Sequence, residues 1–544
     1  MSRRTALLLL GVVGAGAFLS GLELMITAVA LPTIVVDLAD WTQLRPASWI
    51  INGYLLVSIV VMPIAGQLAD RVGVRRVFLS ALVIFVLGSI LAGRATGLGD
   101  LIAARLLQAL GGGALVPVAT AAASHLFEGD ARPRALGAVG AVTFLGMAAG
   151  PFAGAWIMQA IHPEAALASI GVGGALLAAL DAPWRYVFYL NVPIGIALLA
   201  VGWAATAGWE TPRRAHRLDL AGAAAASIGL ATLLLGVTLV GSDPITGLPL
   251  DPSILAAISG VVSIVSFGVA VVIGRRRDEP FIDTAWFRAP SFTSAVLVSL
   301  LTGYGFATAI IGGAVFVDRV LYGGPDQQRI ALGALAAATA VGALGSGLVL
   351  RAIGMRMTTL VGLAAAIGAL VRMAAWTPAT TIGEVAAWLA LFGVGFGLTV
   401  TPRSAAAVEA LGDRAFGIAS AAVTVGRMIG MALGLAALTA FGSTVIDQLW
   451  AEIRATPDAY KAFIPESLRD RAFNDGLVVQ ALEQWASTEA ARILVGVFLI
   501  AAAIMAVAII PALAMGRGRR VESAGEEAAQ GSTGGSVQGV AAAP

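Results

Sequence analysis

The stretch Gly146-Met147-Ala148-Ala149-Gly150-Pro151-Phe152-Ala153-Gly154-Ala155 carries no charge and lies inside a hydrophobic segment long enough to cross a bilayer. In a water-exposed helix, each interior glycine costs about 1 kcal/mol and each proline about 3 kcal/mol. In lipid such a helix survives, because small residues let helices pack closely and neighbouring groups satisfy the backbone that proline leaves unbonded. The stretch therefore predicts a tight, bent contact between membrane-spanning helices.

The composition of the whole chain agrees with this. Of its 544 residues, 58% are hydrophobic and 12% are charged, whereas about a quarter of the residues in soluble proteins are charged. Cysteine is absent and the three histidines are scattered, which leaves little material for catalysis or a metal site. The arginines are spread over many loops, so nucleic-acid binding is not indicated. We expect an all-α polytopic membrane protein that is not an enzyme and holds no metal.

Hydrophobic runs of about 20 residues, the length that crosses about 30 Å of hydrocarbon, predict fourteen spans. They lie near 7–32, 48–69, 76–97, 101–124, 136–158, 186–207, 219–241, 253–274, 292–316, 330–351, 357–376, 384–407, 416–441 and 491–515. An even number of spans puts both termini on the same side of the membrane.

Most of the basic residues gather in alternate loops between these runs, and this pattern sets the orientation. By the positive-inside rule, these loops and both termini are predicted to be cytoplasmic, with the protein in the plasma (inner) membrane. The residues are Arg3, Arg4, Arg71, Arg75, Arg76, Arg132, Arg134, Arg213, Arg214, Arg217, Arg275, Arg276, Arg277, Arg351, Arg356, Arg403, Arg414, Arg517, Arg519 and Arg520.

Four segments need a separate interpretation. The N-terminus imitates a signal peptide, but its apolar run continues to Pro32, so we interpret it as an uncleaved first helix. Residues 160–182 are predicted to form a partly buried loop or short hairpin, because one more span would invert every later loop. Residues 442–490 are polar with several aromatics and are predicted to lie outside, as an interfacial amphipathic helix or as a lid or partner surface. Residues 516–544 are predicted to be a disordered cytoplasmic tail.

A charged turn follows the second span, in the sequence Gly66-Gln67-Leu68-Ala69-Asp70-Arg71-Val72-Gly73-Val74-Arg75-Arg76. Asp70 can pair with arginines or with a helix N-terminus on a neighbouring helix, and breaking that contact would let two halves rock apart. The pattern Gly66, Asp70, Arg71, Gly73 and Arg75 resembles the signature G-x-L-a-D-r-x-G-r-k of the major facilitator superfamily, with Val74 where that family usually has a basic residue. A weaker echo, Gly347-x-x-x-Arg351-x-x-Gly354, follows the tenth span, as expected for related halves.

Other stretches resemble the fourteen-helix drug:proton antiporter branch of that superfamily. The 146–155 stretch resembles its antiporter motif through Gly146, Gly150, Pro151 and Gly154, with Ala155 in place of a glycine. Matches to the first, fourth, sixth and thirteenth helices lie at 22–32, 105–113, 184–195 and 417–430. The resemblance implies two six-helix bundles with two inserted central helices, divided as 1–210, 211–290 and 291–515, the last carrying the outer loop 442–490.

Charges inside the predicted spans are expensive and therefore candidates for function. Glu23 stands where the family usually has Asp, and the resemblance links Arg105 to proton transfer. Burial favours the protonated acid and a nearby arginine favours the carboxylate, so such a pair can exchange protons; alternatively, Glu23 only anchors Arg105 or the substrate. Arg427 is either the intramembrane charge of the C-terminal half or a structural hydrogen-bond donor, and Arg372 is expected to extend to the interface.

The function that this pattern predicts is a proton-coupled exporter of hydrophobic or amphipathic, including cationic, small molecules, working by alternating access. The alternative is a lipid or glycolipid exporter to the outer leaflet. No cofactor is expected: a Walker-type phosphate loop is absent from the sequence and the single lysine, Lys461, lies in the predicted outer loop. The expected partners are protons, the bilayer, the substrate and an extracytoplasmic protein at 442–490.

Overall fold

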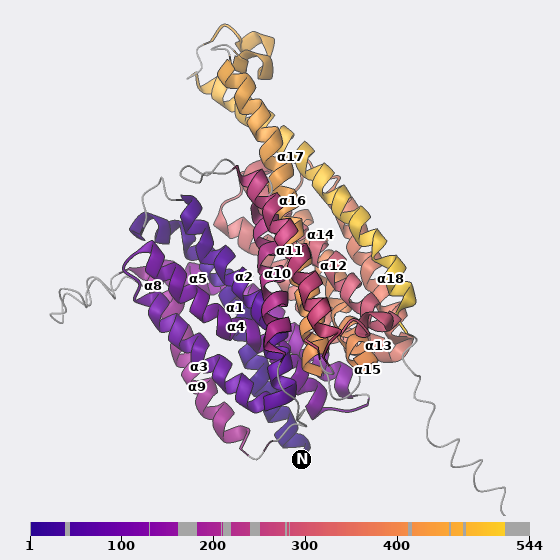
Figure 1. Cartoon of the computed structure of the whole chain (residues 1–544). Helices are drawn as coiled ribbons and strands as arrows, with labels where there is room; N and C mark the ends of the chain where they lie inside the picture. The colour runs from indigo at the N-terminus through magenta and orange to yellow at the C-terminus, as the bar shows by residue number, and fades with distance from the viewer. Residues whose placement is uncertain are drawn as a thin grey trace, which may run out of the picture.

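The computed structural model describes residues 2–38, 44–129, 131–161, 182–207, 209, 219–239, 251–277, 280–281, 283–411, 416–455, 459–471 and 475–516. All regular structure in these residues is helical (Figure 1). The all-α prediction is therefore confirmed. Most of the predicted loop 160–182, the linker around 211–218 and the tail beyond 516 lie outside the described residues.

The N-terminal half supplies six helices or helix pairs that are long and apolar enough to span a membrane. They are α1 (Arg3–Leu38), α2 (Leu44–Val72), α3 (Val74–Gly93), α4 (Leu98–Leu126), α5 (Ala131–Ala160) and the joined pair α8 (Pro183–Tyr189) and α9 (Asn191–Ala205). The short α8 carries Trp184 and Arg185, which bond to residues at the ends of α1 and α3. Trp184 donates to Asp37 at 2.8 Å, and Arg185 donates to the carbonyl oxygens of Gly93 and Ala95 at 3.0 and 2.8 Å.

The C-terminal half follows a helix pair that packs on the boundary between the halves. That pair is α10 (Leu220–Leu239) and α11 (Pro252–Gly274), and α10 contacts both α2 and α16. The half itself consists of α12 (Pro290–Val315), η3 (Phe316–Val320), α13 (Pro325–Met373), α14 (Ile382–Leu398), α15 (Val400–Leu411), α16 (Phe416–Ala455), α17 (Gly476–Val507) and α18 (Ile509–Ala514). Short 3-10 turns occupy Trp286–Arg288, Ala459–Phe463 and Glu466–Leu468.

Thirteen of the described segments qualify as candidate spans, one fewer than the sequence predicts, because α13 contains two of the predicted runs. Its backbone breaks at Gly354, whose φ of 81° lies in the left-handed region that glycine adopts without strain. Divided there, α13 provides the tenth and eleventh spans, and the total agrees with the predicted fourteen. Gly73, with φ of 103°, makes the corresponding break between α2 and α3.

The segment 442–490 differs from the separate interfacial helix that its composition suggested. Its first residues continue α16, which runs for 40 residues, and its last residues begin α17. At 1.5 Å per residue α16 is about 60 Å long, twice the hydrocarbon thickness. Figure 1 shows the two helices projecting from the bundle at the end opposite the N-terminus. Phe463 and Trp485, with ring centres 4.5 Å apart, pack together in this projection.

The tight contact predicted around residues 146–155 is present, and its partner is α1. A methyl group on Gly150 would lie 2.9 Å from the carbonyl oxygen of Leu22 and 2.9 Å from the amide nitrogen of Ile26. On Gly146 it would overlap the carbonyl oxygen of Phe18. Only glycine allows the two backbones to approach this closely.

Candidate functional site

Glu23 and Arg105, which the sequence singles out as a pair, meet in the interior of the N-terminal half. Both side chains are buried, with relative exposures of 0% and 1%, and they form a salt bridge. The Glu23 carboxylate also accepts hydrogen bonds from the amide of Asn191 and from the Thr27 hydroxyl, the latter at 3.0 Å. Helices α1, α4 and α9 therefore meet at one carboxylate.

Arg105 is held by neutral groups as well as by Glu23. It donates to the side-chain oxygen of Gln108 at 2.6 Å and to the carbonyl oxygen of Ile50 at 3.2 Å. Its guanidinium carbon lies 4.1 Å from the centre of the Tyr54 ring, a distance typical of a cation–π contact. These partners would keep Arg105 bound if Glu23 became neutral.

Asn191 is a member of this cluster that the sequence reasoning missed as a site residue. It begins α9 directly after the Trp184-Arg185 turn, inside the 184–195 stretch, and is fully buried. Its side-chain oxygen has no hydrogen-bond partner. The sequence signal that could have identified Asn191 is a single amide side chain at the start of an otherwise apolar helix. We call Glu23, Thr27, Arg105, Gln108 and Asn191 the Glu23 cluster.

Asp70 lies at the contact between the two halves. Its carboxylate accepts hydrogen bonds from the backbone amides of Gly417 and Ile418, at 2.9 and 3.1 Å, where α16 begins. Of the two kinds of partner predicted for Asp70, a helix N-terminus is thus present, and it belongs to the other half. Gly66 makes the approach possible, since a methyl group there would overlap the carbonyl oxygen of Gly417.

Gly73 and Arg75 of the 66–76 motif make a turn and a hydrogen bond within the N-terminal half. Gly73 ends α2 with its positive φ, so the chain can turn at once into α3. Arg75 donates from Nε to the Thr206 hydroxyl at 2.9 Å, which ties α3 to the end of α9. Arg71 is nearly buried, with an exposure of 9%. The motif therefore combines one contact between the halves with contacts inside its own half.

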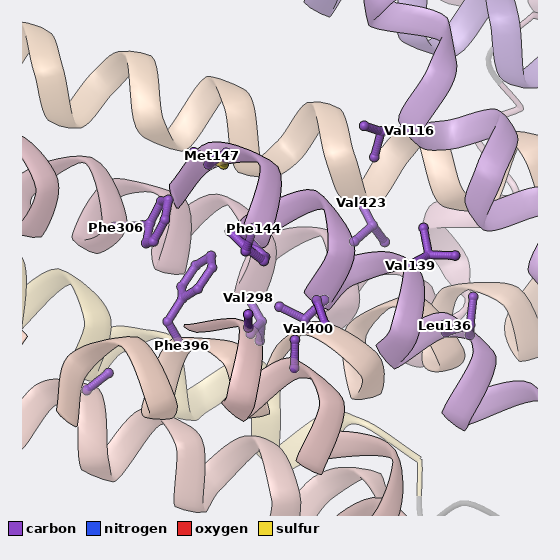
Figure 2. Close-up of a cluster of buried hydrophobic side chains, with 14 of the residues drawn as sticks. Val116, Leu136, Val139, Phe144, Met147, Val298, Phe306, Phe396, Val400 and Val423 are labelled. Atoms are coloured by element: carbon purple, nitrogen blue, oxygen red, sulfur yellow. The ribbon is translucent and has the colours of Figure 1, made fainter. Parts of the chain in front are cut away.

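Arg427 does not join the Glu23 cluster but lies in a cavity between the halves. The cavity of about 30 Å³ is lined by α4, α5, α12, α15 and α16, and Arg403 lines it with Arg427. Figure 2 shows the apolar side chains Val116, Leu136, Val139, Val400 and Val423 of its wall. The residues that line it include no aspartate or glutamate. We call this space the arginine cavity.

Arg403 corrects one prediction, since the sequence analysis counted it among the loop arginines. It lies inside the candidate span Ile382–Leu411 with an exposure of 2%. Its Nε donates to the Thr399 carbonyl oxygen at 2.8 Å, and its guanidinium also donates to the Thr302 hydroxyl. The predicted run 384–407 already includes position 403, so the error was to count Arg403 among the arginines of the following loop.

The two roles predicted for Arg427, the intramembrane charge of the C-terminal half and a structural donor to backbone carbonyls, stay predictions. Its Nε atom is buried and has no hydrogen-bond partner. The guanidinium carbon lies 5.5 Å from the centre of the Phe144 ring. Arg372, by contrast, is exposed and contacts the ring of Trp388 at 5.3 Å, in keeping with the surface position expected for it.

Comparison with known proteins identifies the family. The family model of the Major Facilitator Superfamily matches residues 13–435. The chain belongs to the major facilitator superfamily. The signature at Gly66–Arg76, which suggested this superfamily from sequence, is thus part of a match that covers most of the chain.

Two relatives illustrate what this member of the superfamily is similar to. It is 31% identical over 432 residues to a triacylglyceride transporter of Mycolicibacterium hassiacum, covering 77% of this chain and 76% of the relative. It is 30% identical over 329 residues to the multidrug transporter protein MdtP of Bacillus subtilis, covering 59% of this chain and 53% of the relative. Both relatives are transporters rather than enzymes.

A solved structure supports the same fold. A bacterial homolog of the human lysosomal transporter Spinster, in an inward-facing and unoccupied conformation, superposes with a TM-score of 0.58 at 20% sequence identity. The alignment covers 94% of this chain and 98% of that protein. The major facilitator fold expected from the sequence is therefore confirmed, and the protein is a multi-pass membrane transporter.

Proposed function

We propose that this transporter is a proton-coupled exporter of hydrophobic or amphipathic, including cationic, small molecules, and that it belongs to the fourteen-helix drug:proton antiporter branch. It works by alternating access from the plasma (inner) membrane, with both termini in the cytoplasm. Two six-helix bundles, 1–210 and 291–515, move around the inserted helices of 211–290, and 516–544 form a cytoplasmic tail.

The observation that carries this proposal is the buried Glu23 cluster. The Glu23 carboxylate receives hydrogen bonds from Arg105, Asn191 and Thr27 and so joins α1 to α4 and α9 inside an apolar bundle. Binding a proton removes the salt bridge, while Arg105 keeps its bonds to Gln108 and Ile50. Protonation therefore loosens α1 from α4 and α9 without leaving an unbonded arginine, which is what coupling requires.

The contact at Asp70 supports alternating access. It joins α2 of one half to the start of α16 in the other, and Gly66 and Gly417 bring the two backbones together beside it. On the other side of the same interface, Gly347 of α13 packs on α5 in the same way, where a methyl group would lie 2.9 Å from the carbonyl oxygen of Pro133. These contacts close one end of the bundle and would break when that end opens.

Lipid export is the second candidate function, and one observation favours it. The match to a triacylglyceride transporter covers a larger share of the chain than the match to a multidrug transporter, 77% against 59%. In this case the α16–α17 projection would receive the lipid outside or bind an extracytoplasmic partner. The substrate assay must therefore include a neutral lipid.

The decisive experiment measures proton movement in proteoliposomes that contain a pH-sensitive dye. A lipophilic cation is added first and a triacylglyceride second, with the wild type and with Glu23→Gln. The matched control is Glu384→Gln, which changes an exposed glutamate that caps α14. We expect proton release on adding the cation with the wild type and the control, and none with Glu23→Gln.

The other outcomes assign the function differently. Full proton release by Glu23→Gln would exclude Glu23 as the proton carrier. A response to the triacylglyceride alone, with lipid appearing in the other leaflet faster under a pH gradient, would support lipid export. Substrate movement that ignores the pH gradient in the wild type would exclude proton coupling altogether.

A further inference from the structure

The arginine cavity carries a charge that the proposed substrates do not explain. Two arginines, Arg403 from α15 and Arg427 from α16, line it, and none of its lining residues is acidic. Arg403 is 2% exposed, and the Nε of Arg427 is buried without a partner. Charges at membrane depth are costly and are kept for function. A site with two uncompensated arginines attracts anions and repels cations.

An aromatic group lies directly beside these arginines. Phe144 of α5, Phe306 of α12 and Phe396 of α14 form it; the ring centres of Phe306 and Phe396 are 4.3 Å apart, and those of Phe144 and Phe306 are 5.5 Å apart (Figure 2). The guanidinium carbon of Arg403 lies 5.2 Å from the centre of the Phe396 ring. The arginines thus lie at the edge of an apolar surface that both halves build.

A second cavity continues this surface away from the arginines. It measures about 40 Å³, Phe144 and Phe306 are part of its wall, and most of its other lining residues are apolar: Met25, Met147, Phe152, Ile310, Leu332 and Leu335. Its charged residue, Arg329, forms a salt bridge with Asp326. Between the halves, a cationic space, an aromatic wall and an apolar space therefore follow one another.

We propose that this arrangement is a binding site for an amphiphile with an anionic group, such as a carboxylate or a phosphate monoester. The anionic group binds between Arg403 and Arg427, and the hydrocarbon part lies against Phe144, Phe306 and Phe396 and enters the second cavity. Anionic amphiphiles are a substrate class beside the hydrophobic and cationic ones proposed above, and the assignment rests on the proposed transport function only in that the ligand is carried.

The closed cavity is too small for such a ligand. A volume of about 30 Å³ holds about two water molecules. The anion therefore binds when the contact at Asp70 and Gly66 opens and the two halves separate.

The test is equilibrium binding to the purified full-length protein in maltoside micelles, without any gradient. Radiolabelled dodecyl phosphate is the probe, competed by unlabelled dodecyl phosphate, dodecyltrimethylammonium, dodecanol and inorganic phosphate. The three dodecyl compounds have the same chain length and differ in the charge of the head group, whereas inorganic phosphate has the anionic group without the chain. We expect dodecyl phosphate to compete at least tenfold better than the cation and the alcohol.

Substitutions locate the site. Arg427→Gln is expected to weaken dodecyl phosphate binding about tenfold or more, since it removes a charged hydrogen-bond donor, and Arg427→Lys to retain most of the affinity. The control is Arg372→Gln, which removes an exposed arginine from α13 and should leave binding unchanged. If Arg427→Gln does not fold, the competition series with the wild type still decides the question.

Three results would overturn the proposal: equal or better competition by the cation, equal losses in Arg427→Gln and Arg372→Gln, and competition by inorganic phosphate as strong as that by dodecyl phosphate. The last would indicate a site for free anions only. Because no gradient is present, failure here leaves proton coupling by Glu23 untouched. Conversely, a Glu23→Gln protein that transports normally would not affect this binding result.

Discussion

Helix α5 packs on α1 in the same way as α16 packs on α12, yet the two regions differ in charge. Each contact is made by three glycines four residues apart, which we call the α5 triad and the α16 triad. The triads are Gly146, Gly150 and Gly154, and Gly426, Gly430 and Gly434. They face the backbone carbonyl oxygens of Phe18, Leu22 and Ile26, and of Val296, Leu300 and Tyr304, which are also four residues apart.

The residue after the first glycine shows the difference. It is Met147 in the α5 triad and Arg427 in the α16 triad, and both side chains line cavities between the halves. In the N-terminal half Glu23 neutralises the buried Arg105, whereas Arg403 and Arg427 have no acid beside them in their cavity. The backbone packing is thus repeated, while the buried charges differ: the proposed proton site lies inside one half and the proposed anion site lies between the halves.

The largest expected effect comes from breaking the compensated charge. Glu23→Leu removes the carboxylate and leaves Arg105 buried without a counter-ion, which should lower the free energy of unfolding by about 3–5 kcal/mol. Thermal unfolding of the purified protein measures this. The double variant Glu23→Leu/Arg105→Met should recover most of the loss. If the single variant is as stable as the wild type, Glu23 does not compensate the buried charge of Arg105.

The glycine triads should respond alike, because their packing is alike. Gly150→Leu and Gly430→Leu each push a side chain into a backbone carbonyl, and each should cost about 1–3 kcal/mol. Gly345→Ala in α13 is a control, since nothing lies within 4 Å of its would-be methyl group. A large loss of stability from the substitution in one triad and none from the other would show that the two helix contacts are not equivalent.

Removing the contact between the halves should have a moderate effect. Asp70→Ala removes the acceptor that caps the start of α16. This should destabilise the closed arrangement by about 0.5–2 kcal/mol, which lowers its population relative to the open arrangement about 2- to 30-fold. Since the chain has no cysteine, Thr120→Cys in the arginine cavity can report opening through its reaction with a water-soluble maleimide. The rate should rise in Asp70→Ala and stay constant in Asp100→Asn, a change at the exposed start of α4.

The smallest effect is predicted for the uncompensated arginine. Arg427→Met gives the α16 triad the residue that the α5 triad has, and removes a buried Nε that lacks a partner. Replacing an unpaired buried charge by an apolar side chain should leave thermal stability unchanged or raise it slightly. A loss as large as that of Glu23→Leu would show that Arg427 has a compensating partner after all.

Much of this architecture could be predicted from the sequence. Hydropathy gave the spans, and the Gly66–Arg76 and 146–155 stretches gave the superfamily and one close helix contact. The pairing of Glu23 with Arg105 followed from position and resemblance. The four-residue spacing of Gly426, Gly430 and Gly434 around Arg427 is likewise visible in the sequence and is typical of a close helix contact.

Other features depend on three-dimensional neighbours and could not be predicted. The amide of Asn191 reaches Glu23 only because α9 lies against α1, and no spacing along the chain encodes that contact. Arg403 was assigned to a loop because it is charged and lies near the end of the run 384–407. The continuation of α16 to Ala455 was hidden because polar residues outside a membrane extend a helix without a hydropathy signal.

The hydrogen bonds of Asp70 join a side chain on one half to main-chain amides on the other. Every amino acid except proline supplies the same amide at position 418, so genetic drift there leaves the contact intact. Position 417 is limited for another reason, since a methyl group would meet the carbonyl oxygen of Gly66. Substitutions that break this contact are therefore expected at positions 66, 70 and 417, whereas position 418 accepts any residue except proline.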